Sequence, residues 1–459
     1  MAFFKRKINF IHKKIDLSLK LSMTISLILF LALVSGGFLL TIVADMSWGI
    51  ALYELLYFIY PTNRWWYTIP SVRYTLFLAI ILIIVCFFKK KSLIVSGGAL
   101  FLQLKYLLLM ICMMIIISFY AAWPEQHYRF LQLQVQQFIF LYIAYQAIDS
   151  ECKFDRVLWA FLTGCFYVSY VAYGSARDSF GRVEGIGMPD GPDANTTAAV
   201  LNTAIPFLLH FLINGNKIER IISFLFFPFI VNAVILLNSR GAFLGIFIAM
   251  VYFLFALLRQ KKNFPQIRLT IVFSILVVCL GFFLYLADNV FWERMLTLRD
   301  VKVGEGDATR SNFWLIALHL VLEHPFGIGA GGFEFMSPQL LPPEWLTSSG
   351  RIAEHNTYVQ VLIDFGIMGI VLMGGFILTT LKQVEQIKGI SIKRGDCKSY
   401  TKGLALETSF VSFLIAIIFI NRLYSEVFYW LMLFVAMLTN IYMSSDSPIE
   451  SISSQNGLD

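Results

Sequence analysis

The feature that most constrains this chain is a succession of long apolar runs that continues from residue 21 to residue 442. The first run, Leu21 to Val43, can cross a bilayer, because a helix needs about 20 residues to pass through the hydrocarbon core. Twelve runs are predicted to span: 21–43, 73–88, 104–122, 130–148, 156–173, 196–213, 221–238, 241–258, 268–287, 366–381, 404–420 and 427–442. The sequence therefore predicts an all-α polytopic membrane protein with about twelve transmembrane helices.

Composition excludes a soluble enzyme. Hydrophobic residues make up 58% of the chain and charged residues 14%, whereas a typical globular domain has roughly 45–50% and about 25%. The net charge of +7 does not indicate nucleic-acid binding, because the basic residues lie mostly in short loops between apolar runs. That distribution sets membrane topology. We expect membrane lipids, and no nucleic acid, among the partners.

Basic residues also orient the predicted helices, because lysine and arginine in short loops favour the cytoplasmic side. We expect a multi-pass protein of the cell inner membrane with both termini cytoplasmic. The expected segments are a basic cytoplasmic tail at 1–20, transmembrane helices one to nine within 21–287, a large periplasmic loop with an amphipathic helix at 288–364, helices ten to twelve within 365–442, and a cytoplasmic tail at 443–459.

A thirteenth apolar stretch, Ser47 to Tyr60, is short and contains Glu54. If it crossed the membrane, Lys89, Lys90 and Lys91 would lie outside, against the positive-inside tendency. We interpret this stretch as re-entrant or interfacial.

Lysine and arginine separate on this topology. All lysines except Lys302 fall on the cytoplasmic side, whereas eleven arginines fall on the outer side: Arg64, Arg73, Arg129, Arg177, Arg182, Arg240, Arg294, Arg299, Arg310, Arg351 and Arg422. The planar guanidinium binds phosphate or carboxylate with two hydrogen bonds and keeps its charge. Any single outer arginine can simply contact lipid phosphates, but the whole set indicates a phosphate-bearing ligand.

Two segments before the large loop carry candidate ligand-binding residues. Arg240 interrupts two apolar runs, where a charge is costly unless it is paired or hydrated. The stretch from Arg182 to Asn195 is polar, rich in turn residues, and leads directly into a span. A hairpin charge and a plain connector are the simpler interpretations of these two segments.

The large outer loop contains a predicted amphipathic helix that begins near Arg310. An arginine at a helix N-terminus adds to backbone N–H groups that already favour an anion. The glycine-rich run from Gly327 to Gly332 looks like a nucleotide-binding loop, but no strand precedes it. A tight turn at the membrane surface is therefore the preferred interpretation.

The best candidate for catalysis is Glu354-His355-Asn356, where the outer loop re-enters the membrane ahead of a glycine-spaced helix. Small residues at such spacing let helices approach closely, which fixes His355 at the mouth of a packed bundle. A histidine there can remove a proton near neutral pH when a carboxylate such as Glu354 orients it. A capping or hydrogen-bonding role is the alternative.

These residues resemble the O-antigen ligase and O-antigen polymerase superfamily, and they occur in that family's order over roughly residues 175 to 380. The matching pieces are Asp193-Ala194-Asn195, Ser239-Arg240-Gly241-Ala242, Arg310 with Trp314, His324-Pro325-Phe326-Gly327-Ile328-Gly329, His355-Asn356 and Asp364-Phe365-Gly366-Ile367-Met368-Gly369. Tyr60-Pro61-Thr62-Asn63-Arg64 also resembles the O-glycosylation ligase branch.

The resemblance implies a class-C glycosyltransferase-like membrane fold and an inverting transfer from an undecaprenyl-diphosphate-linked glycan donor. It implies that His355 is the base on the acceptor hydroxyl and that Arg240 and Arg310, with Arg182, hold the diphosphate. Asn195, Asn356 and Glu354 would support them. Neither a metal nor a cofactor is expected, because arginines can stabilise the leaving charge.

The sequence leaves the acceptor open between lipid A core, a glycan end and a protein hydroxyl. We favour a ligase acting on lipid A core over an O-antigen or exopolysaccharide polymerase and over a protein O-glycosylation ligase. A transporter of polysaccharide or lipid-linked glycan is the alternative outside the enzymes. It predicts inverted repeats with paired broken helices, and the sequence shows no clear internal repeat.

Overall fold

The computed structural model describes residues 27–61, 72–88, 99–191, 193–265, 269–296 and 310–444. Within these ranges the fold is all-helical, as predicted, and a single isolated bridge joins Met188 and Gly191. The helices are Leu27–Val43, α2 (Met46–Ile59), α3 (Tyr74–Phe88), α4 (Ala99–Ile117), α5 (Pro124–Ala147), α6 (Glu151–Tyr173), α7 (Ala194–Asn214), α8 (Lys217–Leu237), α9 (Arg240–Arg259), α10 (Leu269–Leu286), α11 (Asn289–Leu296), α12 (Arg310–Glu323), α13 (Gly332–Leu340), α14 (Thr357–Arg394), α15 (Cys397–Ala416) and α16 (Glu426–Ser444).

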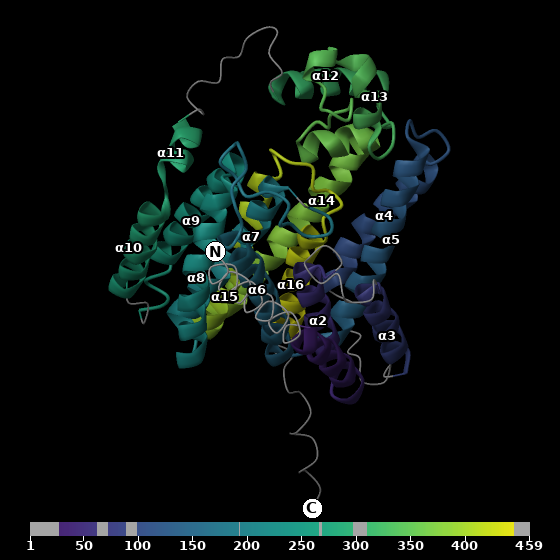
Figure 1. Ribbon diagram of the computed structural model, residues 1–459. Helices are drawn as coiled ribbons and strands as arrows, with labels where there is room; N and C mark the ends of the chain where they lie inside the picture. Colours follow the sequence, from purple (N-terminus) through teal and green to yellow (C-terminus); the bar gives the residue numbers. More distant parts are fainter. Residues whose placement is uncertain are drawn as a thin grey trace, which may run out of the picture.

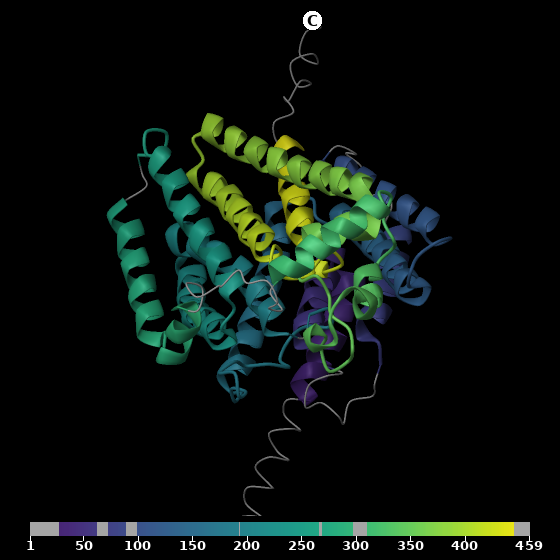
Figure 2. The ribbon, with the colours of Figure 1, turned by 90° about the horizontal axis from the view of Figure 1, so that it is seen from above.

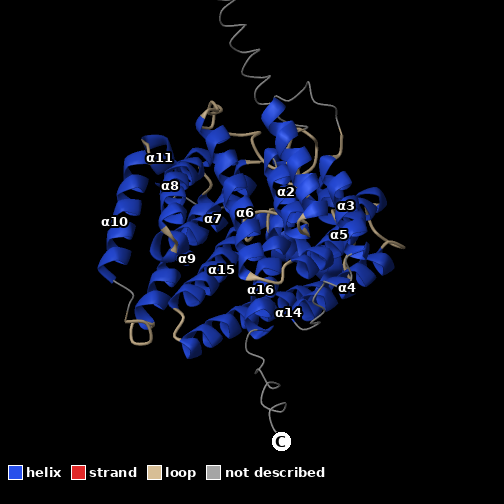
Figure 3. Cartoon of the chain, turned by 90° about the horizontal axis from the view of Figure 1, so that it is seen from below, coloured by secondary structure: helices blue, strands red, loops and turns tan. Residues whose placement is uncertain are grey.

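The bundle is built around α7 and α16, whose apolar segments are 89% and 83% buried. Helix α7 packs against α8 and α15, and α16 packs against α14 and α15. The views from above and below show α14 running along one side of the bundle, with α10 at one edge and α3 to α5 at the other (Figures 2 and 3). Helices α12 and α13 cover one end of the bundle, which we call the α12 end (Figure 1).

Six described helices are long and apolar enough to cross a membrane by length and composition: α4, α7, α8, α9, α14 and α16. The multi-pass membrane character is therefore confirmed. The count of twelve spans and the cytoplasmic placement of both termini stay predictions. Residues 1–26 and 445–459, which include most of the two predicted tails, lie outside the described residues.

The stretch interpreted as re-entrant or interfacial forms α2, which is buried inside the bundle. Its side chains Ile50, Leu56 and Phe58 are at most 1% exposed, and it packs along α6. The interfacial alternative is wrong, because an interfacial helix keeps one face in contact with the lipid surface. Phe58 lies against Gly164, near the middle of α6, so α2 follows only the first part of that helix. The re-entrant alternative stays a prediction.

The predicted large loop ends in a helical segment, and its placement on the outer side stays a prediction. Asn356 caps α14 by accepting hydrogen bonds from the backbone N–H groups of Tyr358 and Val359. The helix therefore begins at Thr357, and it is broken at Gly366, where the predicted span 366–381 begins. Asp364 looked like a loop residue because it is charged, yet it is 1% exposed inside the helix. Its carboxylate accepts hydrogen bonds from the Gly331 N–H and the Tyr424 hydroxyl, which offset the cost of burying it.

The glycine-rich run forms tight turns against a break in α14, as expected. Gly366 has φ 64° and ψ −160° inside α14, a conformation that is nearly restricted to glycine. The break leaves carbonyls without helical partners, and Ile328 N–H and Gly329 N–H donate to the Ile363 and Asp364 carbonyls at 3.0 Å. Pro325 O in turn accepts from Ile367 N–H at 3.1 Å. The run is therefore a structural brace for the entrance to α14.

Helix α12 lies where the sequence predicts an amphipathic helix, but both of its faces carry apolar side chains. Its buried residues Phe313, Ala317 and Leu320 pack with Ile363 of α14 in a separate apolar cluster. Its opposite side exposes further leucines: Leu315, Leu318 and Leu322. The inner face thus attaches α12 to the start of α14, and the outer face is apolar enough to contact lipid.

Candidate active site

Arg240 lies at the turn between α8 and α9, at the α12 end of the bundle. Asn238 ends α8 with φ 49°, and Ser239 caps α9 by accepting a hydrogen bond from Ala242 N–H. The turn borders a pocket of about 30 Å³ that is lined by Asn195, Ser239, Arg240, Gly241, Ala242, Ala416, Phe419 and Ile420. We call it the Arg240 pocket. The helix N-terminus at its edge favours an anion.

Arg182 lies beside this pocket, as the sequence predicted for a ligand-lining loop. Its guanidinium donates to the side-chain oxygen of Asn195 at 3.0 Å and to Leu237 O at 3.2 Å, and it pairs with Glu184 at 3.3 Å. Asn195 lies in the first turn of α7, whose N-terminus Asp193 caps. Arg182, Asn195 and Arg240 therefore converge although two loops and two helices separate them in the chain.

The start of α14 is attached to the wall of the Arg240 pocket. Thr357 N–H donates to Ile417 O at 2.9 Å, and the Thr357 hydroxyl donates to Ile420 O at 2.6 Å. Asn356 N–H donates to the side-chain oxygen of Asn421 at 2.8 Å. Because Ala416 and Ile420 also line the pocket, the segment that carries His355 and Asn356 packs against the same wall from the other side.

His355 itself has an unusual backbone. Its φ is 51°, in the left-handed region that is uncommon for residues other than glycine. Such strain persists only where the surroundings enforce it, and it is often found at functional sites. Here the enforcing contacts are those of Asn356 and Thr357 on one side and of Glu354 on the other.

Glu354 is buried next to His355, with 4% of its surface exposed. Its backbone carbonyl accepts a hydrogen bond from Trp314 Nε1 at 2.8 Å. Burial is the main cause that raises the pKa of the Glu354 carboxyl from 4.5 to about 7, and the nearby Glu334 carboxylate adds to it. A hydrogen bond from Asn421 acts in the opposite direction. A carboxyl with this pKa can exchange a proton near neutral pH.

Arg310 is the first residue of α12, one turn before Trp314. Residues four apart lie on the same face of a helix, and Trp314 contacts Glu354 through its indole N–H. The backbone at Arg310 is therefore one turn from the Glu354-His355 segment, although its side chain lies outside the part of the chain that the structure describes. The start of α12 thus lies close to the Glu354-His355 segment. The residues that follow His355 pack against the wall of the Arg240 pocket.

Arg422 is a site residue that motif reasoning missed. Its guanidinium donates to Asp193 at 2.7 Å and to Asp190 O, and its N–H donates to the Thr357 hydroxyl at 2.8 Å. It thus ties the loop before α7 to the start of α14. The signal that could have found it is its membership of the outer arginine set. Burial raises the pKa of Asp193, but the charge of Arg422 and hydrogen bonds from Thr196 outweigh it and lower the pKa below its ordinary value.

Among the described residues, no group of three or more histidine, cysteine, aspartate or glutamate side chains is arranged to hold a metal ion. The positive charge around the Arg240 pocket comes from arginines. That the protein needs neither a metal nor a cofactor for its reaction stays a prediction, to be tested on the active protein.

Comparison with protein families identifies one domain. Residues 224–374 match the family model described as O-antigen ligase. The matched segment runs from α8 into α14 and contains Arg240, Arg310 and His355, while Arg182 and Asn195 precede it. No curated protein matches the chain.

Proposed function

Because residues 224–374 match the O-antigen ligase family model, we propose that the protein is a membrane glycosyltransferase of the O-antigen ligase superfamily that joins a glycan to an acceptor hydroxyl. The donor is a glycan on undecaprenyl diphosphate, and the reaction takes place at the periplasmic face of the inner membrane. Lipid A core is the proposed acceptor.

One observation carries this proposal: two arginines meet at a small polar pocket whose wall also supports a strained histidine. Arg182 and Arg240 supply charge at the pocket, and His355 follows a buried carboxyl on the other side of the segment 416–422. A diphosphate leaving group needs fixed positive charge where its own charge develops, and the acceptor needs a base within hydrogen-bond reach.

The proposed step balances as follows. His355 takes the proton of the acceptor hydroxyl, and the acceptor oxygen forms a bond to the anomeric carbon of the donor sugar. The bond between that carbon and the diphosphate oxygen breaks on the opposite side, so the configuration inverts. Arg240 and Arg310, with Arg182 behind them, stabilise the undecaprenyl diphosphate that leaves. Asn195 and Asn356 position Arg182 and His355.

The testing experiment is a transfer assay with purified protein in phospholipid vesicles. The donor is an undecaprenyl-diphosphate-linked oligosaccharide, and lipid A core, a free glycan and a serine- and threonine-containing peptide are offered as acceptors. We expect product on lipid A core, and we expect it to persist in excess EDTA. Loss of activity that magnesium or manganese restores would reject metal independence.

The same assay separates the alternatives. Product on the glycan alone would make the protein a polymerase, and product on the peptide alone would make it a protein O-glycosylation ligase. Passage of intact donor across the vesicle membrane without any product would show that the protein is a transporter and not an enzyme.

A further inference from the structure

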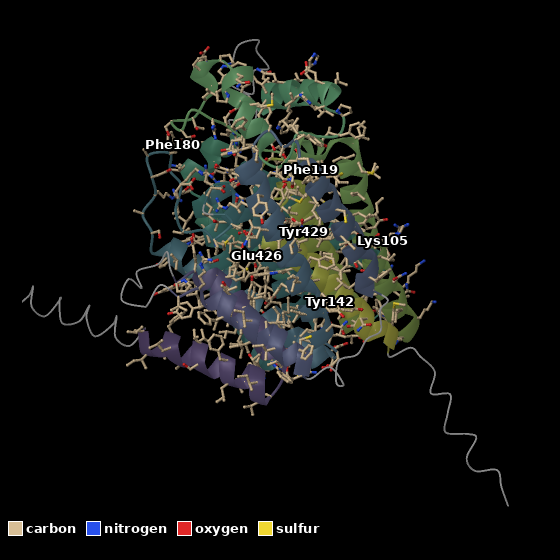
Figure 4. The ribbon with its side chains drawn as sticks, turned by 90° about the vertical axis from the view of Figure 1, so that its right-hand side faces the viewer. Lys105, Phe119, Tyr142, Phe180, Glu426 and Tyr429 are labelled. Atoms are coloured by element: carbon tan, nitrogen blue, oxygen red, sulfur yellow. The ribbon has the colours of Figure 1, made fainter. Side chains whose placement is uncertain are left out.

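A second and much larger cavity, of about 480 Å³, lies between α2, α3, α5 and α16. Its volume is within the range of small-molecule sites, which are mostly apolar with a few placed polar groups. We call it the α3–α5 cavity. Figure 4 labels two of its wall residues, Glu426 and Tyr429, inside the bundle and below Phe119 and Phe180. The catalytic roles proposed above do not use it.

The polar wall of this cavity combines hydrogen-bond acceptors with tyrosine hydroxyls. Asp190 and Glu426 contribute carboxylates, and Gln137 contributes an amide. Gln137 is 9% exposed and donates through Nε2 to Tyr424 O at 2.9 Å. Its buried Oε1 has no hydrogen-bond partner within the described structure, and such an atom costs free energy unless a ligand or water donates to it.

The carboxylates are held in place by the protein. The Tyr57 hydroxyl and the Glu426 backbone N–H, the latter at 2.8 Å, donate to Asp190, and the Tyr53 hydroxyl is hydrogen-bonded to the Glu426 side chain. The rings of Tyr53 and Tyr57 pack edge-on against Trp430. Aromatic surface beside fixed acceptors can hold a molecule that has both hydroxyl groups and apolar faces.

The remaining wall is apolar and opens toward the membrane. Leu76, Ile80 and Ile83 of α3 line the cavity and are each more than 40% exposed. Leu133 and Ile139 of α5 face them across it. A ligand can therefore keep an alkyl chain at the lipid-exposed side while its polar head reaches the acceptors.

The α3–α5 cavity and the Arg240 pocket share two pieces of wall. The loop before α7 contributes Asp190 to the α3–α5 cavity, and the first turn of α7 contributes Asn195 to the Arg240 pocket. The segment before α16 contributes Tyr424 to the α3–α5 cavity and Ile420 to the Arg240 pocket. Arg422 joins the two segments through its hydrogen bonds to Asp190 and Asp193. Two ligands bound in these sites would therefore lie next to each other.

We propose that the α3–α5 cavity binds a hydroxyl-bearing amphipath, such as a membrane-anchored sugar, and that this is the acceptor's site. The proposal rests on the proposed transfer function. A diphosphate has oxygen acceptors and negative charge, so the Asp190 carboxylate repels it. Arg73, the one basic side chain among the described residues of the wall, is exposed. Sugar hydroxyls, by contrast, donate to every unfilled acceptor.

The test is photolabelling of the full-length protein in phosphatidylcholine nanodiscs. The probe is decyl glucoside with a photoreactive alkyl chain, and unlabelled decyl glucoside and decyl phosphate are the competitors. We expect saturable labelling of peptides from α3 and α5 that decyl glucoside prevents and decyl phosphate does not. Equal competition by decyl phosphate, or displacement by phosphatidylethanolamine, would overturn the assignment to a hydroxyl-bearing ligand.

Two variants and a matched control sharpen the result. Ile80→Trp fills the cavity from α3, and Glu426→Gln replaces one of its two carboxyl groups by an amide, so each should reduce probe affinity by about tenfold or more. Ile84 is on the same helix, is 48% exposed and does not line the cavity. The affinity of Ile84→Trp for the probe should therefore match that of the wild type. Equal labelling of Ile80→Trp and Ile84→Trp would overturn the proposal, even if Glu426→Gln failed to fold.

Labelling and transfer are measured separately, which distinguishes the two proposals. In the transfer assay, Ile80→Trp should raise KM for the acceptor and leave KM for the donor unchanged. Specific labelling without any transfer would reject the transfer function and retain the binding site. Transfer without saturable labelling would reject the binding site and retain the transfer function.

Discussion

Tyr60, Asn238 and His355 are the non-glycine residues with positive φ in the described chain. Tyr60 lines the α3–α5 cavity, Asn238 precedes the turn of Arg240, and His355 precedes the start of α14. Asparagine and histidine tolerate this region better than most residues, whereas tyrosine does not. All three residues lie next to segments to which we assign ligand binding.

Replacing Arg240 by lysine keeps the charge and removes the planar fork. We expect the transfer rate to fall at least about tenfold, because lysine cannot bind a diphosphate through two parallel hydrogen bonds. Arg259→Lys is the matched control, since Arg259 is exposed at the other end of α9. The measurement is transfer in vesicles at saturating acceptor. Equal rates for the two variants would remove Arg240 from the diphosphate site.

The raised pKa of Glu354 predicts how stability depends on pH. The folded protein holds the proton up to about pH 7, whereas the unfolded chain releases it near 4.5. The stabilisation is therefore complete below pH 4.5 and is lost as pH rises through 7. Glu354→Gln should remove this loss in the free energy of unfolding, which amounts to roughly 3 kcal/mol at pH 8.

The measurement is thermal denaturation in detergent between pH 5 and pH 8. The melting temperature of the wild type should fall more over this range than that of Glu354→Gln. Glu344→Gln, a change at an exposed glutamate of the same loop, should behave like the wild type. If the melting temperature of Glu354→Gln fell with pH as much as that of the wild type, ionisation of Glu354 would not be the cause of the fall.

At the scale of elements, the break in α14 determines how the large loop joins the bundle. A Cβ at Gly366 would lie 2.0 Å from Pro325 O, and alanine does not adopt its backbone conformation. Gly366→Ala should therefore destabilise the protein by more than about 2 kcal/mol. Gly374→Ala, in the same helix with open space around its Cβ, should be neutral or slightly stabilising. Thermal denaturation of both variants tests this, and equal melting temperatures would contradict it.

Elements that follow from local chemistry were predicted well. The apolar runs indicated most of the helices, and the glycine run indicated tight turns. The helical segment 357–365 was not predicted, because a charged Asp364 suggests a loop. Its partners, Gly331 and Tyr424, are 33 and 60 residues away, and no local pattern reveals contacts at that separation.

For the whole molecule, the sequence indicated which residues carry the chemistry more clearly than how they meet. Arginine enrichment on one predicted side pointed to a phosphate ligand, and the structure gathers Arg182, Arg240 and Arg422 at one end of the bundle. The sequence did not reveal the α3–α5 cavity. That cavity depends on gaps between four helices, and packing gaps leave no periodic signal in the sequence.

The central claim is that segments from α9, α12 and α14 form one active site with His355 as its base. The most direct test compares His355→Ala with His319→Ala in the vesicle transfer assay, since His319 is an exposed histidine of α12. We expect His355→Ala to bind the lipid-linked donor like the wild type and to transfer it roughly a hundredfold more slowly, while His319→Ala is unaffected. Wild-type transfer by His355→Ala would show that His355 is not the base.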